Sequence, residues 1–244
     1  MRILYIFPHP DDESFGPAAG IHAQLQEGHE VFLLTLTKGG ATKQRFALGV
    51  TVAEMGEIRY KEMLEVEKTL GLTGMTVLDF PDSGLKELDP RILEGAVADQ
   101  IETIRPDIVI TYPVHGISGF HDHLITHAIV KRAYLDLKGK GASYLKRLAF
   151  FTLLDSGEAS LHKESGDFRL KRSDMEQIDC ILPLETQNQD ALIKSLSCYN
   201  TYKKTIEDTK VIEKIGNQLY FEIFLEEFKP PLTDITAQIK KQTM

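Results

Sequence analysis

Two short polar segments contain histidines and carboxylates close enough in sequence to bind a metal ion or to transfer a proton together. The first, His9-Pro10-Asp11-Asp12-Glu13, places one imidazole and three carboxylates in five residues directly after an apolar run. Unpaired carboxylates at this spacing repel one another, so a bound cation is the simplest way to hold them together. Taken alone, this segment is more simply explained as an acidic surface turn. The second segment, residues 112–123, changes that balance because it packs three histidines and an aspartate around glycines.

These residues would make a metal site if the fold brings the two segments together. A small set of histidine and carboxylate ligands suits zinc or another divalent transition metal. A histidine of the second segment would complete a His, Asp, His set and leave one position open for water. An open position is typical of a catalytic metal rather than a structural one.

Alternating strands and helices must position these segments. Short apolar runs predict strands at residues 3–7, 31–36, 75–80, 107–112 and 145–153, and helical periodicity predicts helices at 16–28, 51–70, 90–104 and 124–137. This alternation predicts an α/β fold, a Rossmann-like doubly wound and mostly parallel sheet with helices on both faces. Ligands in that architecture lie beyond the carboxyl ends of the strands, and the first and fourth strands commonly flank the switch point. The two polar segments should therefore meet there.

The pattern weakens after residue 153. Polar residues 155–177 favour a hairpin or an excursion, followed by an edge strand at 180–182, a helix at 190–202 and a strand at 219–224. We expect a single domain over 1–244, with a core at 1–153 and a C-terminal elaboration at 154–244.

Composition narrows the class of partner. The 244 residues are 42% hydrophobic and 26% charged, with a formal net charge of -8. Without a clustered basic stripe this charge disfavours nucleic acid and favours a small polar substrate. The two cysteines favour a reducing compartment, by default the cytoplasm. No apolar run reaches the roughly 18 residues of a membrane span, so no membrane partner is expected. A homo-oligomer is compatible with this composition.

The two polar segments resemble the PIG-L/LmbE-like zinc N-deacetylases, whose signature is a His-Pro-Asp-Asp-Glu loop after the first strand and a distal Gly-His-Pro-Asp-His. Further similar segments are Thr37-Lys38-Gly39-Gly40, Gly56-Glu57-Ile58-Arg59 and Phe80-Pro81-Asp82-Ser83-Gly84, so the resemblance covers about residues 1–135. It implies that His9, Asp12 and His123 bind Zn²⁺. Fe²⁺ is an alternative in the cell, because the same ligands accept both ions.

The resemblance also implies a set of catalytic residues. Asp11 corresponds to the general base of the family. The distal motif departs from the signature, since Phe120 stands where the family has its first histidine and His121 stands where it has proline. We assign the oxyanion-stabilising role to His121, one residue away, with the metal and another group as the alternative. We expect Asp122 to orient a histidine.

The substrate contacts that we expect are Arg59, Asp82, Lys38 and Glu13. The resemblance implies that Arg59 holds the polar tail of the substrate, such as a malate or phosphate group. Each residue has a plainer alternative: a solvated charge for Arg59, a turn residue for Asp82, a surface charge for Lys38, and pairing with a helix N-terminus for Glu13.

The predicted reaction is hydrolysis of the acetyl amide of an N-acetylglucosaminyl conjugate. The distal segment and the chain length are similar to bacterial deacetylases of bacillithiol biosynthesis, which implies N-acetylglucosaminyl malate. Two alternatives remain open, an amidase acting on a thiol conjugate or another amide or ester, and a sugar-binding Rossmann-like module without catalysis. The substitution at Phe120 favours the module, whereas an intact base beside intact ligands weighs against it.

Overall fold

The computed structural model describes residues 1–155, 170–214 and 216–239. These residues form a seven-stranded sheet in the order β3-β2-β1-β4-β5-β7-β6. The strands are β1 (Arg2–Phe7), β2 (Glu30–Thr37), β3 (Gly74–Phe80), β4 (Ile108–Thr111), β5 (Arg147–Thr152), β6 (Cys180–Pro183) and β7 (Gln218–Ile223). Strands β1 to β5 pair in parallel, and β7 runs antiparallel to both β5 and β6. The predicted α/β, doubly wound and mostly parallel fold is confirmed.

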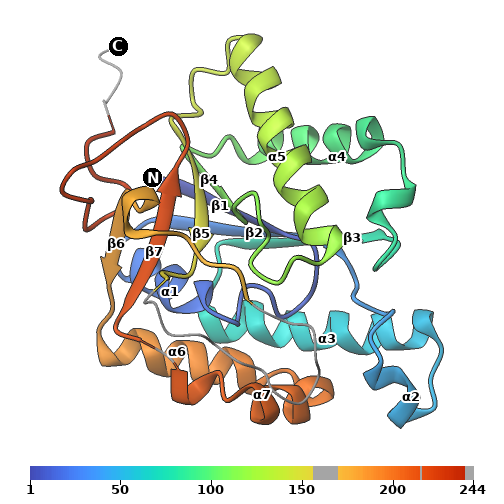
Figure 1. Cartoon of the computed structure of the whole chain (residues 1–244). Helices are drawn as coiled ribbons and strands as arrows, with labels where there is room; N and C mark the ends of the chain where they lie inside the picture. The colour runs from blue at the N-terminus through green and yellow to red at the C-terminus, as the bar shows by residue number, and fades with distance from the viewer. Residues whose placement is uncertain (156–169, 215, 240–244) are drawn as a thin grey trace.

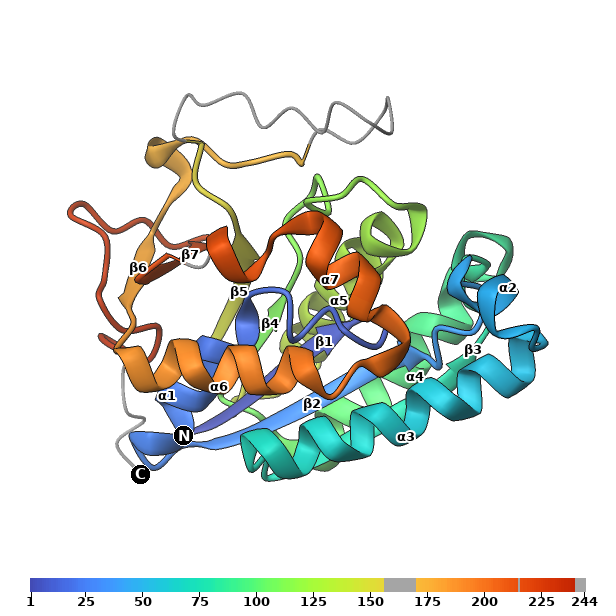
Figure 2. The same cartoon turned by 90° about the horizontal axis from the view of Figure 1, so that it is seen from below.

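Helices cover both faces of the sheet (Figures 1 and 2). One face carries α1 (Pro17–Gln26), α3 (Val52–Leu70) and α6 (Thr186–Ser197), and the other carries α4 (Pro90–Ile104) and α5 (His121–Gly139). Two short helices, α2 (Gln44–Leu48) and α7 (Lys203–Thr209), complete the described set.

The unbroken apolar run of β1 is explained by these two layers. Tyr5 and Phe7 point into the core beneath α1 and α3, while Leu4 and Ile6 point into the core beneath α4 and α5. All four side chains are buried. A strand that is buried on both faces must be apolar at every position, which is why its sequence lacks alternation.

Local signals set the helix boundaries. Thr51 and Glu54 form a capping box that begins α3, and Gly71, in the left-handed conformation, ends it. Helix α5 begins at His121 rather than at the expected residue 124, because Phe120 is still extended and the chain turns helical directly after it. The distal histidine His123 therefore lies in the first turn of a helix.

The C-terminal third of the chain continues the same sheet. β6 is the edge strand that the sequence predicts, and α6 packs against α1. Helix α6 begins at Thr186, earlier than the expected residue 190. Of the expected excursion over 155–177, residues 156–169 lie outside the described part of the chain.

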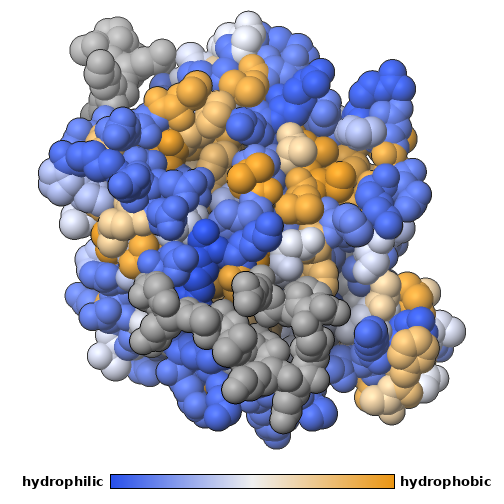
Figure 3. All heavy atoms as spheres, in the orientation of Figure 1, coloured by the Kyte–Doolittle hydropathy of each residue, from blue (hydrophilic) through white to orange (hydrophobic). Residues whose placement is uncertain are grey.

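On the face seen in Figure 3, the coloured residues are mostly hydrophilic. An apolar area lies over α2, where Phe46 and Leu48 are exposed. Among the described residues, no helix combines the length and the apolar composition that crossing a bilayer requires.

The strand order creates the predicted switch point. β1 pairs with β2 on one side and with β4 on the other. The chain leaves β1 toward β2 and later returns to β4, so the carboxyl ends of β1 and β4 lie side by side. The two polar segments follow these two strand ends.

Candidate metal centre

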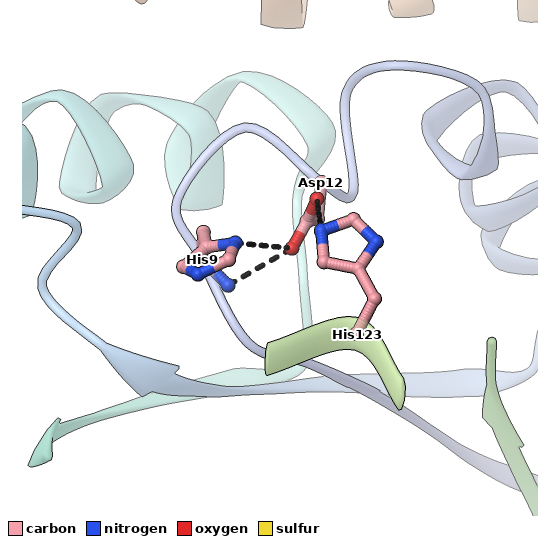
Figure 4. A group of neighbouring side chains, drawn as sticks. All are labelled: His9, Asp12 and His123. Atoms are coloured by element: carbon pink, nitrogen blue, oxygen red, sulfur yellow. Dashed lines mark hydrogen bonds and ion pairs between the residues drawn. The ribbon is translucent and has the colours of Figure 1, made fainter. Parts of the chain in front are cut away.

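Three side chains from the two segments converge beyond the sheet (Figure 4). His9 Nδ1 lies 3.6 Å from Asp12 Oδ2, and His123 Nε2 lies 3.4 Å from Asp12 Oδ1. The ligand atoms of His9, Asp12 and His123, the ligand group from here on, all lie within 4.8 Å of one another. Bonds of about 2.0–2.2 Å in a tetrahedral zinc site place neighbouring ligand atoms about 3.3–3.6 Å apart. The spacing and the donor types of the ligand group fit a divalent metal ion.

Asp12 lies between the two histidines of this group and accepts two further hydrogen bonds. The His9 backbone N–H donates to Asp12 Oδ2 at 2.9 Å, and the Tyr112 hydroxyl donates to Asp12 Oδ1 at 2.8 Å. Burial by itself raises the pKa of Asp12, but His123, His9 and Tyr112 outweigh it and lower that pKa to about 2. The carboxylate is therefore charged at neutral pH, as a metal ligand must be.

His123 presents the correct nitrogen to the group. Its Nδ1 lies 2.9 Å from the carbonyl oxygen of Gly116, an acceptor, so Nδ1 carries the proton and Nε2 keeps its lone pair toward Asp12. Gly116 has a φ of 63°, and a Cβ there would lie 2.8 Å from the Cβ of His123. Burial lowers the pKa of His123, which favours the neutral ring. The ring stacks on Tyr112 with a centroid distance of 4.3 Å.

His9 uses its second nitrogen to contact two carboxylates. Nε2 lies 3.1 Å from Asp122 Oδ2 and 3.3 Å from Asp82 Oδ1. Burial lowers the pKa of His9, but Asp12, Asp122 and Asp82 raise it to about 10, so a metal bound at Nδ1 would have to displace a proton from the ring. Asp122 also accepts a 2.8 Å hydrogen bond from the Ser83 backbone N–H. A carboxylate in this position orients a ligating imidazole, the arrangement expected for Asp122.

Asp11 lies beside the ligand group but outside it. Its φ of 84° is in the left-handed region, and its Oδ2 accepts a 2.5 Å hydrogen bond from Arg59 Nη2. Burial raises the pKa of Asp11 to about 7, against the opposing effect of Arg59. A carboxyl group with such a pKa can both accept and return a proton near neutral pH.

The family assignment follows from the match of these segments. A family model described as PIG-L, GlcNAc-PI de-N-acetylase, matches residues 4–134, more than half of the chain. The chain belongs to the PIG-L family. The predicted resemblance is confirmed over the strands, loops and helices that build the ligand group.

The curated relatives that the chain matches are named as an amidase and as deacetylases. The mycothiol S-conjugate amidase of Streptomyces coelicolor is 32% identical over 152 residues, covering 55% of this chain and 52% of the relative. The 1D-myo-inositol 2-acetamido-2-deoxy-alpha-D-glucopyranoside deacetylase of Kineococcus radiotolerans is 29% identical over 168 residues, covering 58% and 46%. The chain thus spans about half the length of these curated relatives.

Solved structures support the fold. A deacetylase of the teicoplanin biosynthesis pathway superposes with a TM-score of 0.67 at 17% identity, covering 91% of this chain and 97% of that one. GalB, a 4-carboxy-2-hydroxymuconate hydratase from Pseudomonas putida, has the same TM-score of 0.67 at 12% identity, covering 93% and 97%. Because a hydratase and a deacetylase share the architecture, the reaction must be argued from the site.

The chain has Phe120 at the position where the PIG-L signature has its first distal histidine. Phe120 is half exposed, and its ring meets that of His123 edge-on at 5.7 Å. His121 is exposed on the first turn of α5, and the ligand group forms without it. The oxyanion role of His121 stays a prediction.

The four expected substrate contacts are placed differently from one another. Asp82 lies next to the ligand group. Its Oδ1 is 3.3 Å from His9 Nε2, and its Oδ2 accepts a 2.7 Å hydrogen bond from the Ala41 N–H. Lys38 instead pairs with Glu57 at 2.6 Å and with Asp79 at 3.5 Å, away from the ligand group.

The other two are buried. Glu13 is 0% exposed, and its Oε1 accepts hydrogen bonds from Ser14 and Tyr199. Arg59 is 2% exposed, so the alternative of a solvated surface charge is wrong. Substrate contact by either residue stays a prediction.

Tyr112 is a residue of the candidate site that the sequence did not single out. It lies within the second polar segment and directly after β4, and that position at a strand end was the available signal. Its contacts to both Asp12 and His123 depend on strand pairing and could not be read from spacing.

Proposed function

We propose that the chain is a metal-dependent N-deacetylase that removes the acetyl group from an N-acetylglucosaminyl conjugate. The observation that carries the proposal is the ligand group with the unligated Asp11 beside it. A binding module has no use for a base next to metal ligands. The names of the relatives support the substrate class, since one is a 2-acetamido-glucopyranoside deacetylase and another, from Bos taurus, an N-acetylglucosaminyl-phosphatidylinositol de-N-acetylase that is 30% identical over 150 residues.

The residues present fit a zinc ion, with Fe²⁺ as the alternative. Two imidazole nitrogens and one carboxylate oxygen are the donors that a catalytic zinc site uses. When bound, such an ion would supply a Lewis acid for the amide carbonyl and for the attacking water. His9, Asp12 and His123 would hold it, and Asp122 would keep His9 in orientation.

Asp11 carries the proton through the reaction. It accepts a proton from the water whose oxygen attacks the amide carbonyl carbon, and it returns that proton to the amide nitrogen as the carbon–nitrogen bond breaks. The products are acetic acid and the free amine of the sugar, which ionise to acetate and an ammonium group. We assign Asp82, which lies next to His9, to a contact with a sugar hydroxyl, and His121 to the developing oxyanion.

The finer substrate that we propose is N-acetylglucosaminyl malate, the conjugate implied by the resemblance to bacillithiol-pathway deacetylases. A specific alternative is an amidase acting on a thiol conjugate, favoured by the 32% identity to the mycothiol S-conjugate amidase. We place the reaction in the cytoplasm, where the free Cys180 and Cys198 stay reduced.

The test is amine release by the zinc-loaded protein, with and without a chelator. The substrates are N-acetylglucosaminyl malate, free N-acetylglucosamine and a mycothiol S-conjugate. Chelator-sensitive release from the malate conjugate is expected. Release from the S-conjugate alone would establish the amidase instead, and no release from any substrate with metal bound would overturn the proposal.

Asp11→Asn tests the assigned base. We expect this variant to retain stoichiometric metal and to lose about 10²–10⁴-fold in turnover, the range of general acid–base catalysis. Asp99→Asn, an exposed carboxylate on α4, is the matched control and should keep full activity. Undiminished turnover in Asp11→Asn would remove Asp11 from the mechanism.

A further inference from the structure

Arg59 is among the largest fully buried side chains of the protein, although it carries a charge. A buried guanidinium is costly unless its charge is paired and its N–H groups find acceptors. Here Nη2 donates to Asp11 Oδ2 at 2.5 Å and to the Pro10 carbonyl at 2.6 Å, and Nη1 donates to the Gly39 carbonyl at 3.1 Å. All three acceptors belong to the loops that follow β1 and β2.

The surrounding chain encloses the guanidinium. Its central carbon lies 4.1 Å from the ring centroid of Tyr202, whose hydroxyl donates to Thr42 at 2.7 Å. Gly39 has a φ of 65°, and a Cβ there would lie 2.3 Å from Arg59 Nη1. Arg59 Nε has no hydrogen-bond partner among the described residues and is itself buried. The hydrogen bonds from Nη1 and Nη2 all go to protein atoms, and the side chain as a whole is 2% exposed.

The two contacts of Nη2 act on consecutive residues of the metal-binding loop. The hydrogen bond to the Pro10 carbonyl holds the peptide group that precedes Asp11, and the hydrogen bond to Oδ2 holds the Asp11 side chain. Asp11 has a φ of 84°, a conformation that non-glycine residues adopt when surrounding contacts hold them there. Through these contacts Asp11 is directed away from the group that its neighbour Asp12 joins, and its Oδ1 is left to take a proton.

We propose that Arg59 is a positioning residue that holds Asp11 beside the ligand group, and that it does not bind the substrate's polar tail. The proposal rests on the function proposed above, in which Asp11 is the base. It joins three segments of the chain, the loop after β1, the turn after β2 and the middle of α3, in one arrangement around one carboxylate.

The two roles of Arg59 predict different kinetics. A residue that binds an anionic tail affects KM for N-acetylglucosaminyl malate and leaves free N-acetylglucosamine, which has no tail, unchanged. A residue that positions the base lowers kcat for both substrates alike. We expect Arg59→Ala and Arg59→Lys to lose about 10²-fold in kcat on both, the size of effect that a displacement of about 1 Å can produce. KM should stay within about twofold.

Arg147→Lys is the matched control, because Arg147 is also a buried arginine. It pairs with Glu226 at 2.8 Å and is the first residue of β5, whereas the ligand group lies beyond the carboxyl ends of the strands. Loss of either arginine should lower the unfolding temperature, but the kcat of Arg147→Lys should equal that of wild type. Added guanidine should restore turnover in Arg59→Ala, and Arg59→Ala should cost nothing further in an Asp11→Asn background.

Crystal structures of zinc-loaded Arg59→Ala and Arg59→Lys decide the matter independently of activity. We expect the Asp11 carboxylate to leave its wild-type position while His9, Asp12 and His123 stay in place. An unmoved Asp11 would overturn the proposal, as would a rise in KM confined to the malate conjugate with kcat unchanged. Should the wild type hydrolyse none of the substrates, the proposed function fails, and the position of Asp11 in these crystals still decides the role of Arg59.

Discussion

The hydroxyl of Tyr112 should contribute measurably to metal affinity, and Tyr112→Phe isolates that contribution. The change removes the 2.8 Å hydrogen bond to Asp12 Oδ1 and keeps the aromatic ring that stacks on His123. The residue is 4% exposed, so water cannot easily replace the lost donor. The altered partner is the carboxylate that contacts both histidines of the ligand group.

The magnitude follows from the charge on the acceptor. A hydrogen bond to a charged group contributes about 1.5–3 kcal/mol, and a tenfold change in affinity corresponds to about 1.4 kcal/mol. The expected loss is therefore about 10- to 150-fold in zinc affinity, close to the roughly 10–100-fold effect of removing a group that hydrogen-bonds a metal ligand. Activity at saturating zinc should change much less.

Competition with a chromophoric zinc chelator at fixed pH measures this affinity. Tyr5→Phe is the matched control, since it also removes a buried tyrosine hydroxyl. Tyr5 lies on β1, and its hydroxyl donates to Gln24 at 3.1 Å. That control should bind zinc within about twofold of wild type. If Tyr112→Phe is folded and binds zinc as tightly as Tyr5→Phe, the inference that Tyr112 supports Asp12 is refuted.

Three further predictions concern stability and reactivity away from the ligand group. Burial raises the pKa of Glu222 above its ordinary 4.5, so its contribution to stability is present below pH 4.5 and is lost as the pH rises through the raised value. In urea unfolding, Glu222→Gln should therefore lose less stability between pH 5 and pH 8 than wild type does; an equal loss would contradict this. Thr51→Ala removes the capping box of α3 and should lower the free energy of unfolding by about 1 kcal/mol, and a value unchanged from wild type would show that the cap is dispensable. A thiol reagent at pH 8 should modify the partly exposed Cys198 in the native protein, whereas Cys180, buried with its pKa raised to about 12, should react after unfolding; equal rates would disprove the difference.

Fold class could be predicted because its signals are local. Strands buried on both faces are apolar throughout, and helices show a 3.6-residue period, so element types and their alternation follow from short stretches of sequence. Helix α5 begins three residues before the helix that the sequence predicts, because its first turn holds His121, Asp122 and His123 instead of the apolar residues that mark a helix.

The proximity of His9, Asp12 and His123 could also be predicted from the sequence, for a related reason. His9 and Asp12 are three residues apart in one loop, and parallel strands place the segments that follow them at one edge of the sheet. His123 needed one further inference, that β1 and β4 are neighbours, which the pairing of these strands bears out.

The contacts that orient the group were decided by the tertiary structure. Asp11 meets Arg59 across 48 residues of sequence, Asp12 meets Tyr112 across 100, and His9 meets Asp122 across 113. Such pairings depend on side-chain directions, on the burial that makes an unpaired charge costly, and on the order in which strands are placed in the sheet. Residue types and strand order are enough to predict which residues could bind a metal and where along the fold they lie. The packing of α3 against the loops after β1 and β2 determined that Arg59 faces the carboxylate of Asp11, because a buried guanidinium must find its counter-charge within the protein.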